Sequence, residues 1–150
     1  MGDTHLHGQL DANTLPVDEL VAALRAGVRG MQSSEAAVEL IVAHDFWLTR
    51  PDFRRFVNVT LRLDGTGLLA SIDWPAVADD YLPSSASESS ILRLACEVAG
   101  MPTDSSLQEL VNGLDETNLV LALRAILHAA GGAGATPVLV APWPLEDPEP

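Results

Sequence analysis

The chain has 150 residues, 47% of them hydrophobic, a length and composition typical of one globular domain whose core needs no disulfide or metal. Its 21 acidic and 8 basic residues give a formal net charge of −13, which disfavours non-specific binding to nucleic acid or to an anionic membrane. No apolar run is long enough to span a bilayer, and the N-terminus has no signal-peptide pattern, so we expect a cytoplasmic protein. Cys96, the single cysteine, lies among apolar residues and is expected to be a buried, inert thiol.

Residues 1–14 are polar and show no periodicity, which predicts a flexible N-terminal tail. His5 and His7 alternate there as metal ligands can, but no later His or Cys is spaced to complete the site. We therefore expect no metal and no other cofactor. A first helix is predicted from about Pro16 to Arg29, where apolar residues recur at helical spacing, and Gly30 is expected to end it.

A second helix is expected from residue 33 or 34 through 47 or 48, and a short third helix follows with Pro51 in its first turn. The apolar residues of the third helix predict an inward face, with Arg54 and Arg55 directed outward. Next, Val59–Leu63 alternates at a period of two and leads into Asp-Gly, which is typical of a hairpin. We therefore expect a small two-stranded ribbon at about residues 59–72.

Asp73, Ser85 and Ser105 have side chains that cap helices, and each is expected to begin one, the fourth, fifth and sixth of the chain. The last helix, Leu119–Ala130, follows a further cap at Asp115 and is apolar at nearly every position. Helices that are apolar most of the way round are usually covered on several sides. We therefore expect this helix to lie at the centre of the domain.

These elements predict an all-α domain over residues 15–131, a roughly six-helix orthogonal bundle around the central C-terminal helix, with the hairpin as an addition. Residues 132–150 are rich in Gly, Pro and acidic residues and predict a C-terminal tail, because the prolines exclude a helix. Thr117, Arg124 and His128 fall on one narrow polar strip of the last helix. This strip is either the seam where an outer helix packs or the floor of a small polar site.

Residues 95–113 have the outline of a helix-turn-helix, a helix and a shorter helix joined at a glycine. The second helix of that unit presents Asp104, Gln108 and Glu109, with no Arg or Lys to contact phosphate or guanine. The sequence therefore argues against direct nucleic-acid binding. A helix-turn-helix regulator is retained as an alternative function.

Arg50, Arg54, Arg55 and Arg62 are half of all the basic residues and give a local positive excess in an acidic protein. Guanidinium groups suit carboxylate or phosphate partners, so this cluster is the candidate partner-binding patch. The alternative is a solvated face whose arginines form ion pairs with neighbouring helices.

His44, His128 and Asp115 are the candidate catalytic residues, as an acid–base site of a small hydrolase or transferase. No nucleophile elbow, metalloprotease motif, Gly-rich phosphate loop or cysteine pair accompanies them. The sequence therefore favours a protein without enzymatic activity, and the small enzyme is an alternative.

Several short stretches together cover most of residues 34–130. They are Ala37-Val-Glu-Leu-Ile-Val-Ala-His44 with Trp47-Leu-x-Arg50 and Asp52-Phe53; Ile72-Asp-Trp74; Ser87-Glu88 with Ile91-Leu-Arg93; and Gly113-Leu-Asp115-x-x-Asn118 with His128-Ala129. In these stretches the chain resembles a class of short, uncharacterised helical proteins of actinobacteria and their mobile elements. The resemblance implies one coherent helical unit from a high-GC bacterium, with both tails as additions. It implies no activity, because the class has none to carry over.

The absence of a site motif, together with the strong negative charge, favours a non-enzymatic protein–protein interaction or regulatory module. A specific version is an acidic decoy that occupies the basic groove of a nucleic-acid-binding partner. We therefore expect a protein partner and no membrane contact.

Overall fold

The described part of the chain, residues 9–132 of this computed structural model, is mostly helical with one small sheet. His5, His7 and residues 133–150 of the expected C-terminal tail lie outside it. In chain order the elements are β1 (Leu10–Asp11), the 3-10 helix η1 (Ala12–Thr14), α1 (Val17–Val28), α2 (Gln32–His44), the 3-10 helix η2 (Trp47–Thr49), α3 (Pro51–Arg54), β2 (Val57–Leu61), β3 (Leu68–Ile72), α4 (Trp74–Asp79), α5 (Ala86–Val98), α6 (Leu107–Gly113) and α7 (Glu116–Ala129).

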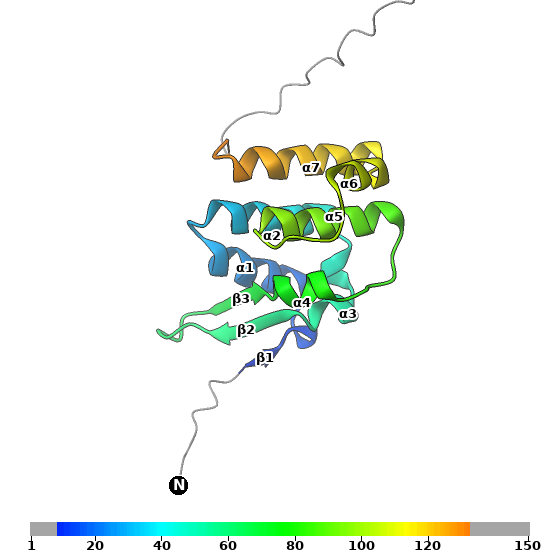
Figure 1. Ribbon diagram of the computed structural model, residues 1–150. Helices are drawn as coiled ribbons and strands as arrows, with labels where there is room; N and C mark the ends of the chain where they lie inside the picture. Colours follow the sequence, from blue (N-terminus) through cyan, green and yellow to red (C-terminus); the bar gives the residue numbers. More distant parts are fainter. Residues whose placement is uncertain (1–8, 133–150) are drawn as a thin grey trace, which may run out of the picture.

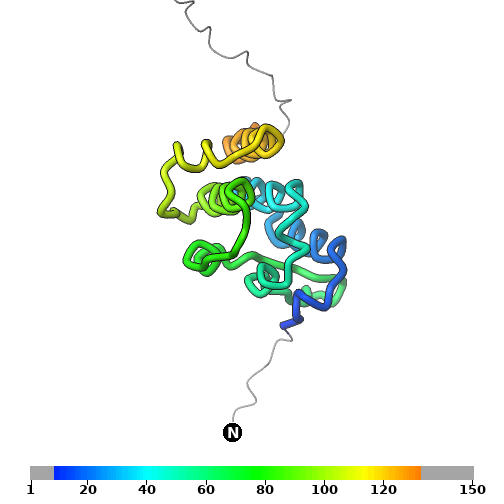
Figure 2. Tube along the Cα trace, turned by 90° about the vertical axis from the view of Figure 1, so that its right-hand side faces the viewer, coloured from blue at the N-terminus to red at the C-terminus, as the bar shows by residue number. Residues whose placement is uncertain are grey.

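The elements stack from the sheet at one end to α6 and α7 at the other (Figure 1). α1 packs on β3 and on α2, and α2 in turn packs on α5 and α7. The view turned by 90° shows α6 and α7 as an outer layer above α5 and α2 (Figure 2). The order of layers places α2 and α5 in the middle and α7 on the outside.

The sheet contains the predicted hairpin and one additional strand, in the antiparallel order β1-β2-β3. β2 and β3 pair with Val57 opposite Ile72. β1 pairs Leu10 with Val59, so residues 10–14, which the sequence placed in the N-terminal tail, belong to the folded body. Two residues of strand are too few to show an alternating pattern, which is why the sequence did not indicate β1.

Gly27 allows α1 to lie directly against β3. A β-carbon at Gly27 would lie 2.0 Å from the carbonyl oxygen of Ala70, far inside contact distance. Any other residue would therefore push the helix away from the strand. α1 and β3 thus pack backbone to backbone at the sheet end of the molecule.

α2 is the central helix. Its successive residues Ala36, Ala37 and Val38 are at most 1% exposed, and Leu40 and Ile41 are buried as well. Three neighbouring helices, α1, α5 and α7, cover it from different sides. α2 therefore occupies the central position that the sequence analysis assigned to the C-terminal helix.

The prediction that the C-terminal helix is central is wrong. On α7 the side chains of Leu119, Val120, Leu123 and Ile126 are 38–55% exposed. α7 is buried along one side only, through Ala122, Ala125 and Asn118 where it meets α2 and α5. Leu121 also packs against the core, whereas Leu119, Val120, Leu123 and Ile126 are exposed. Composition alone does not distinguish a covered apolar helix from one whose apolar face has no partner within the described chain.

Local capping sets several helix boundaries. α5 begins at the predicted capping box of Ser85 and Glu88, and Asp115 caps α7 by accepting from the backbone N–H of Asn118. α6 is capped by Ser106, one residue after the predicted Ser105. α2 ends at residue 44, before the predicted boundary, because Asp45 adopts the left-handed conformation with φ of 54°.

Candidate functional site

The predicted arginine patch does not form one free basic surface, because Arg54 is buried at 8% exposure. Its Nε donates to the carbonyl oxygen of Leu48 at 2.6 Å, and its Nη1 donates to that of Leu15 at 2.9 Å. The prediction that Arg54 faces outward is therefore wrong. A guanidinium that satisfies backbone carbonyls ties the N-terminal segment to the turn before α3, and it has no side-chain surface to offer a partner.

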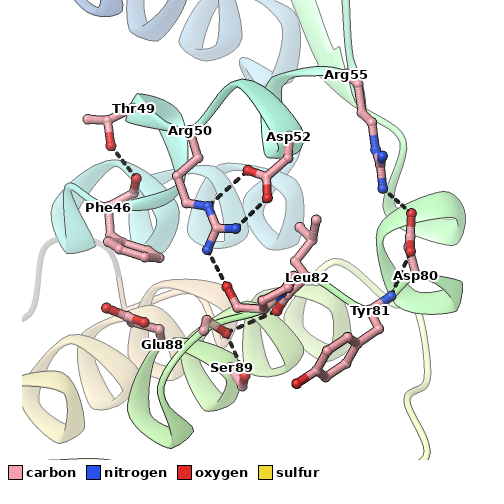
Figure 3. Close-up of polar contacts among 12 residues, drawn as sticks. Phe46, Thr49, Arg50, Asp52, Arg55, Asp80, Tyr81, Leu82, Glu88 and Ser89 are labelled. Atoms are coloured by element: carbon pink, nitrogen blue, oxygen red, sulfur yellow. Dashed lines mark hydrogen bonds and ion pairs between the residues drawn. The ribbon is translucent and has the colours of Figure 1, made fainter.

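Arg50 and Arg55 are engaged in contacts within the molecule (Figure 3). Arg50 binds both carboxylate oxygens of Asp52, donates to the carbonyl oxygen of Pro83 at 2.6 Å, and lies 5.4 Å from the centre of the Phe46 ring. The hydrogen bonds from Arg50 hold the pKa of Asp52 below its usual value. Arg55 forms an ion pair with Asp80 on the exposed surface.

Arg62 is exposed on the hairpin and makes no hydrogen bond or ion pair with another side chain among residues 9–132. The four arginines thus separate into one buried, two paired and one isolated group. Partner binding by Arg50, Arg55 and Arg62 stays a prediction, and Arg54 is excluded from such a surface by its burial.

The candidate catalytic residues lie at the two ends of the α2–α7 pair. His128, near the end of α7, is 3.3 Å from Glu35 in the first turn of α2. His44 is the last residue of α2 and lies near Asp115 at the start of α7. His44 lies nine positions after Glu35 on the same helix, which is about 14 Å along the axis. The structure does not bring the two imidazoles together.

His44 lies near Asp115. Its Nδ1 is buried and has no hydrogen-bond partner among residues 9–132, and burial lowers the pKa of the imidazole below its ordinary value of 6.5. Nearby Glu88, Asp115 and Asp45 act in the opposite direction on that pKa but more weakly. His44 is therefore a neutral, partly buried side chain at neutral pH.

Asp115 is fully used in a junction that joins the start of α7 to the start of α5. The Ser87 hydroxyl donates to its Oδ2 at 2.9 Å, and the Asn118 Nδ2 donates to the Ser87 Oγ at 2.7 Å. The backbone N–H of Asp115 also donates to the Ser87 Oγ, at 3.2 Å. The serine oxygen thus donates one hydrogen bond and accepts two, so it has no free lone pair for attack on a substrate. This cluster is a helix junction.

The buried thiol of Cys96 also lacks the features of a nucleophile. The side chain is 1% exposed, and burial raises its pKa to about 12. It lies beside a small cavity of about 80 Å³. The prediction of a buried thiol is confirmed, and the raised pKa keeps it protonated at neutral pH.

More than half of the large apolar side chains that are exposed among the described residues lie on α7 and α6. We define the outer face as Leu119, Val120, Leu123 and Ile126 of α7 together with Leu107 and Val111 of α6. Leu107 is 69% exposed and Leu123 is 55% exposed. Both helices are capped by side chains at their N-termini and are well formed. Large exposed apolar patches on a folded protein mark interaction sites.

The polar strip of the last helix borders a groove between α2 and α7. Arg124 and His128 line it from α7, and Glu39 lines it from α2. Its volume is about 280 Å³, and most of the remaining lining is alanine and leucine. Thr117 is exposed and lies outside this lining. The strip is thus partly a seam against α2 and partly the rim of a groove.

Sequence reasoning missed the outer face because it interpreted an apolar helix as a covered one. Leu119, Leu123 and Ile126 share one side at i, i+4 and i+7, but Ala122 lies three residues after Leu119 and four before Ile126, so the buried alanines border that side and do not lie opposite it. The helical pattern alone therefore does not separate the buried side of this helix from its exposed side.

No family model, curated protein or solved structure matches this chain. The resemblance to actinobacterial proteins therefore stays a prediction. Among residues 9–132, no helix is long and apolar enough to cross a bilayer. The same residues contain no group of three His, Cys, Asp or Glu side chains placed to hold a metal ion.

Proposed function

We propose that this protein is a non-enzymatic protein–protein interaction module and that the outer face of α7 and α6 is its docking surface. The observation that carries the proposal is that four large apolar side chains along α7 are exposed, whereas the buried residues of this helix are Asn118, Ala122 and Ala125. Exposing this surface costs free energy in water, which a bound partner would recover.

The spacing of the outer face suits a helical partner. Leu119, Leu123 and Ile126 recur at i, i+4 and i+7, which is the pattern of anchors between two packed helices. Leu107 and Val111 on α6 recur at i and i+4 and are exposed as well, and α6 belongs to the same outer layer as α7. The partner is therefore expected to present an apolar helix face of at least two turns.

Charge indicates the chemistry at the edge of that partner. The outer layer from residue 104 to residue 132 has one arginine, Arg124, and several acids: Asp104, Glu109, Asp115 and Glu116. Lys or Arg beside the partner's apolar stripe would complement these acids. A second copy of this chain would bring two net charges of −13 together, so we assign the surface to a different, basic protein.

The narrower version of the proposal is an acidic decoy, in which the partner's basic surface is one that otherwise contacts nucleic acid. The same acids support it, because they would occupy positions that phosphates take on such a surface. This version adds one requirement to the docking proposal: the partner cannot hold nucleic acid and this protein at the same time.

Two synthetic helical peptides test the docking surface directly. Both carry the same Leu/Ile stripe, flanked by lysines in one and by glutamates in the other, and each is titrated into the ¹⁵N-labelled full chain. We expect the lysine-flanked peptide to bind, to shift the amide signals of α6 and α7, and to bind more weakly as salt is added. Leu123→Gln is expected to weaken binding by about tenfold or more, because one buried leucine is lost from the contact.

Leu63→Gln is the matched control, because Leu63 is a fully exposed leucine on the hairpin, far from the outer layer. It should leave peptide binding unchanged. Equal binding of both peptides, shifts outside α6 and α7, or no effect of Leu123→Gln would each overturn the proposal. A dimer of the free protein in light scattering that Leu123→Gln converts to a monomer would assign the surface to a second copy instead.

A further inference from the structure

We propose that the groove between α2 and α7 binds a small amphipathic carboxylate, with Arg124 holding the carboxylate and the apolar floor holding the carbon chain. The groove lies on the side of α7 that faces α2, away from the outer face, so this inference does not depend on the docking proposal.

Small side chains make up much of the lining of the groove. Ala36 and Ala43 line it from α2, and Ala125 lines it from α7. Leu40 and Leu121 complete an apolar floor. The volume of about 280 Å³ is slightly below the range of about 300–1,000 Å³ that is typical of sites for drug-sized ligands. It suits a short carbon chain.

Of the charged and titratable side chains that line the groove, Glu39 and His128 have partners among residues 9–132 and Arg124 does not. Glu39 gives both carboxylate oxygens to Arg25, at 2.7 and 2.9 Å. His128 lies 3.3 Å from Glu35. Arg124 makes no ion pair or hydrogen bond through its side chain with any other residue between 9 and 132. The groove therefore presents one uncompensated positive charge above an apolar floor.

The ligand class follows from that charge and from its surroundings. A guanidinium fork binds planar carboxylates through two parallel hydrogen bonds. The net charge of −13 opposes the approach of multiply charged anions such as phosphate esters, so a single negative charge fits better. The apolar floor requires a hydrocarbon body next to that charge. A monocarboxylate with a short aliphatic chain meets all three conditions.

Octanoate titrated into the ¹⁵N-labelled full chain tests this proposal. We expect saturable shifts in the amide signals of residues 36–43 and 121–128. 1-Octanol, which has the chain without the charge, and acetate, which has the charge without the chain, should bind much more weakly. Arg124→Gln is expected to weaken octanoate binding by about tenfold or more, because a charge-assisted contact is removed.

Ala43→Leu is a second variant that does not depend on the charge. Ala43 is exposed and lines the groove, so a larger side chain there fills the groove without disturbing the core, and octanoate binding should be lost. Arg62→Gln removes an exposed arginine on the hairpin and is the matched control, with binding unchanged.

Three results would overturn the proposal. The first is the absence of saturable shifts with octanoate below its micelle-forming concentration. The second is equal binding of octanol and octanoate with no effect of Arg124→Gln, which would leave a merely apolar surface. The third is a set of nuclear Overhauser contacts from residues 133–150 to the groove in the free protein, which would assign the groove to the chain's own C-terminal segment.

Discussion

Helices α2 and α7 have similar lengths, 13 and 14 residues, and both are rich in Ala, Leu, Val or Ile. In α2 the large residues Leu40 and Ile41 are buried together with the alanines, because α1, α5 and α7 cover the helix. In α7 only the alanine side is buried, and Leu123 and Ile126 are exposed. The apolar residues of α2 thus build this protein's own core, whereas the large apolar residues of α7 stay exposed, and it is there that we propose a partner docks.

A matched pair of isoleucines gives the sharpest test of this difference. Ile41→Ala on α2 removes a fully buried side chain and is expected to lower the free energy of unfolding by about 2–5 kcal/mol. Ile126→Ala on α7 truncates a side chain that is 46% exposed, and its effect is expected to stay within about 1 kcal/mol. Urea denaturation of both variants at one protein concentration measures the two costs.

Equal costs for the two variants would contradict the comparison, because they would mean that Ile126 is covered in solution. Dilution then separates two causes. A cost at Ile126 that disappears in dilute protein indicates a second copy on α7, and a cost that persists indicates that the rest of this chain covers the helix.

The junction that holds α7 to α5 gives the next largest expected effect. Asn118 is buried, and its Nδ2 donates to Ser87 and to Asp115. Asn118→Ala leaves these buried acceptors with fewer partners and is expected to lower stability by about 1–3 kcal/mol. Asn112→Ala, at an exposed position of α6, is the control and should be close to neutral. Hydrogen exchange should then show faster exchange in α7 than in α2, since the junction fastens the outer helix; uniform exchange in both helices would contradict that role.

Local chemistry in the sequence predicted much of the fold. The Asp-Gly turn after an alternating strand predicted the hairpin, and the Ser85/Glu88 capping box predicted the start of α5. Both signals lie within a few residues of the element that they specify. The position of α7 depends instead on which distant helices cover α2, and no local pattern carries that information.

The candidate site residues show the same division. The sequence placed His44 and His128 in one possible site, but the antiparallel packing of α2 and α7 places them at opposite ends. Arg54 follows Phe53 in a four-residue helix, where one helical turn cannot define a reliable inward side. Its burial depends on the carbonyl oxygens of Leu15 and Leu48, and only the folded chain brings these to it. The sequence did place Arg124 on the polar strip of the last helix, but it did not predict the groove that this strip borders.

The smallest expected effect is a change in how stability depends on pH, and it tests the contact between the end of α2 and the start of α7. Burial lowers the pKa of His44 below 6.5, so the unfolded chain takes up a proton at a higher pH than the folded chain does. Above about pH 7, His44 is neutral in both the folded and the unfolded chain, and the free energy of unfolding is not reduced by its protonation. As the pH falls below 6.5, the unfolded chain binds the proton first, so the folded state becomes less stable. His44→Gln should flatten the dependence of the melting temperature on pH between about 7 and 5.

The carboxylates near this contact do not produce the same signal. Hydrogen bonds from the backbone of Asn118 and from Ser87 lower the pKa of Asp115, so the stabilisation from this group is lost only as the pH falls below the ordinary range of a carboxyl group. His128→Gln is the matched control, because it removes an imidazole at the other end of α7. If His44→Gln leaves the pH dependence of the melting temperature as steep as in the unmodified chain, the imidazole of His44 is not buried in solution, and the contact between the end of α2 and the start of α7 is open.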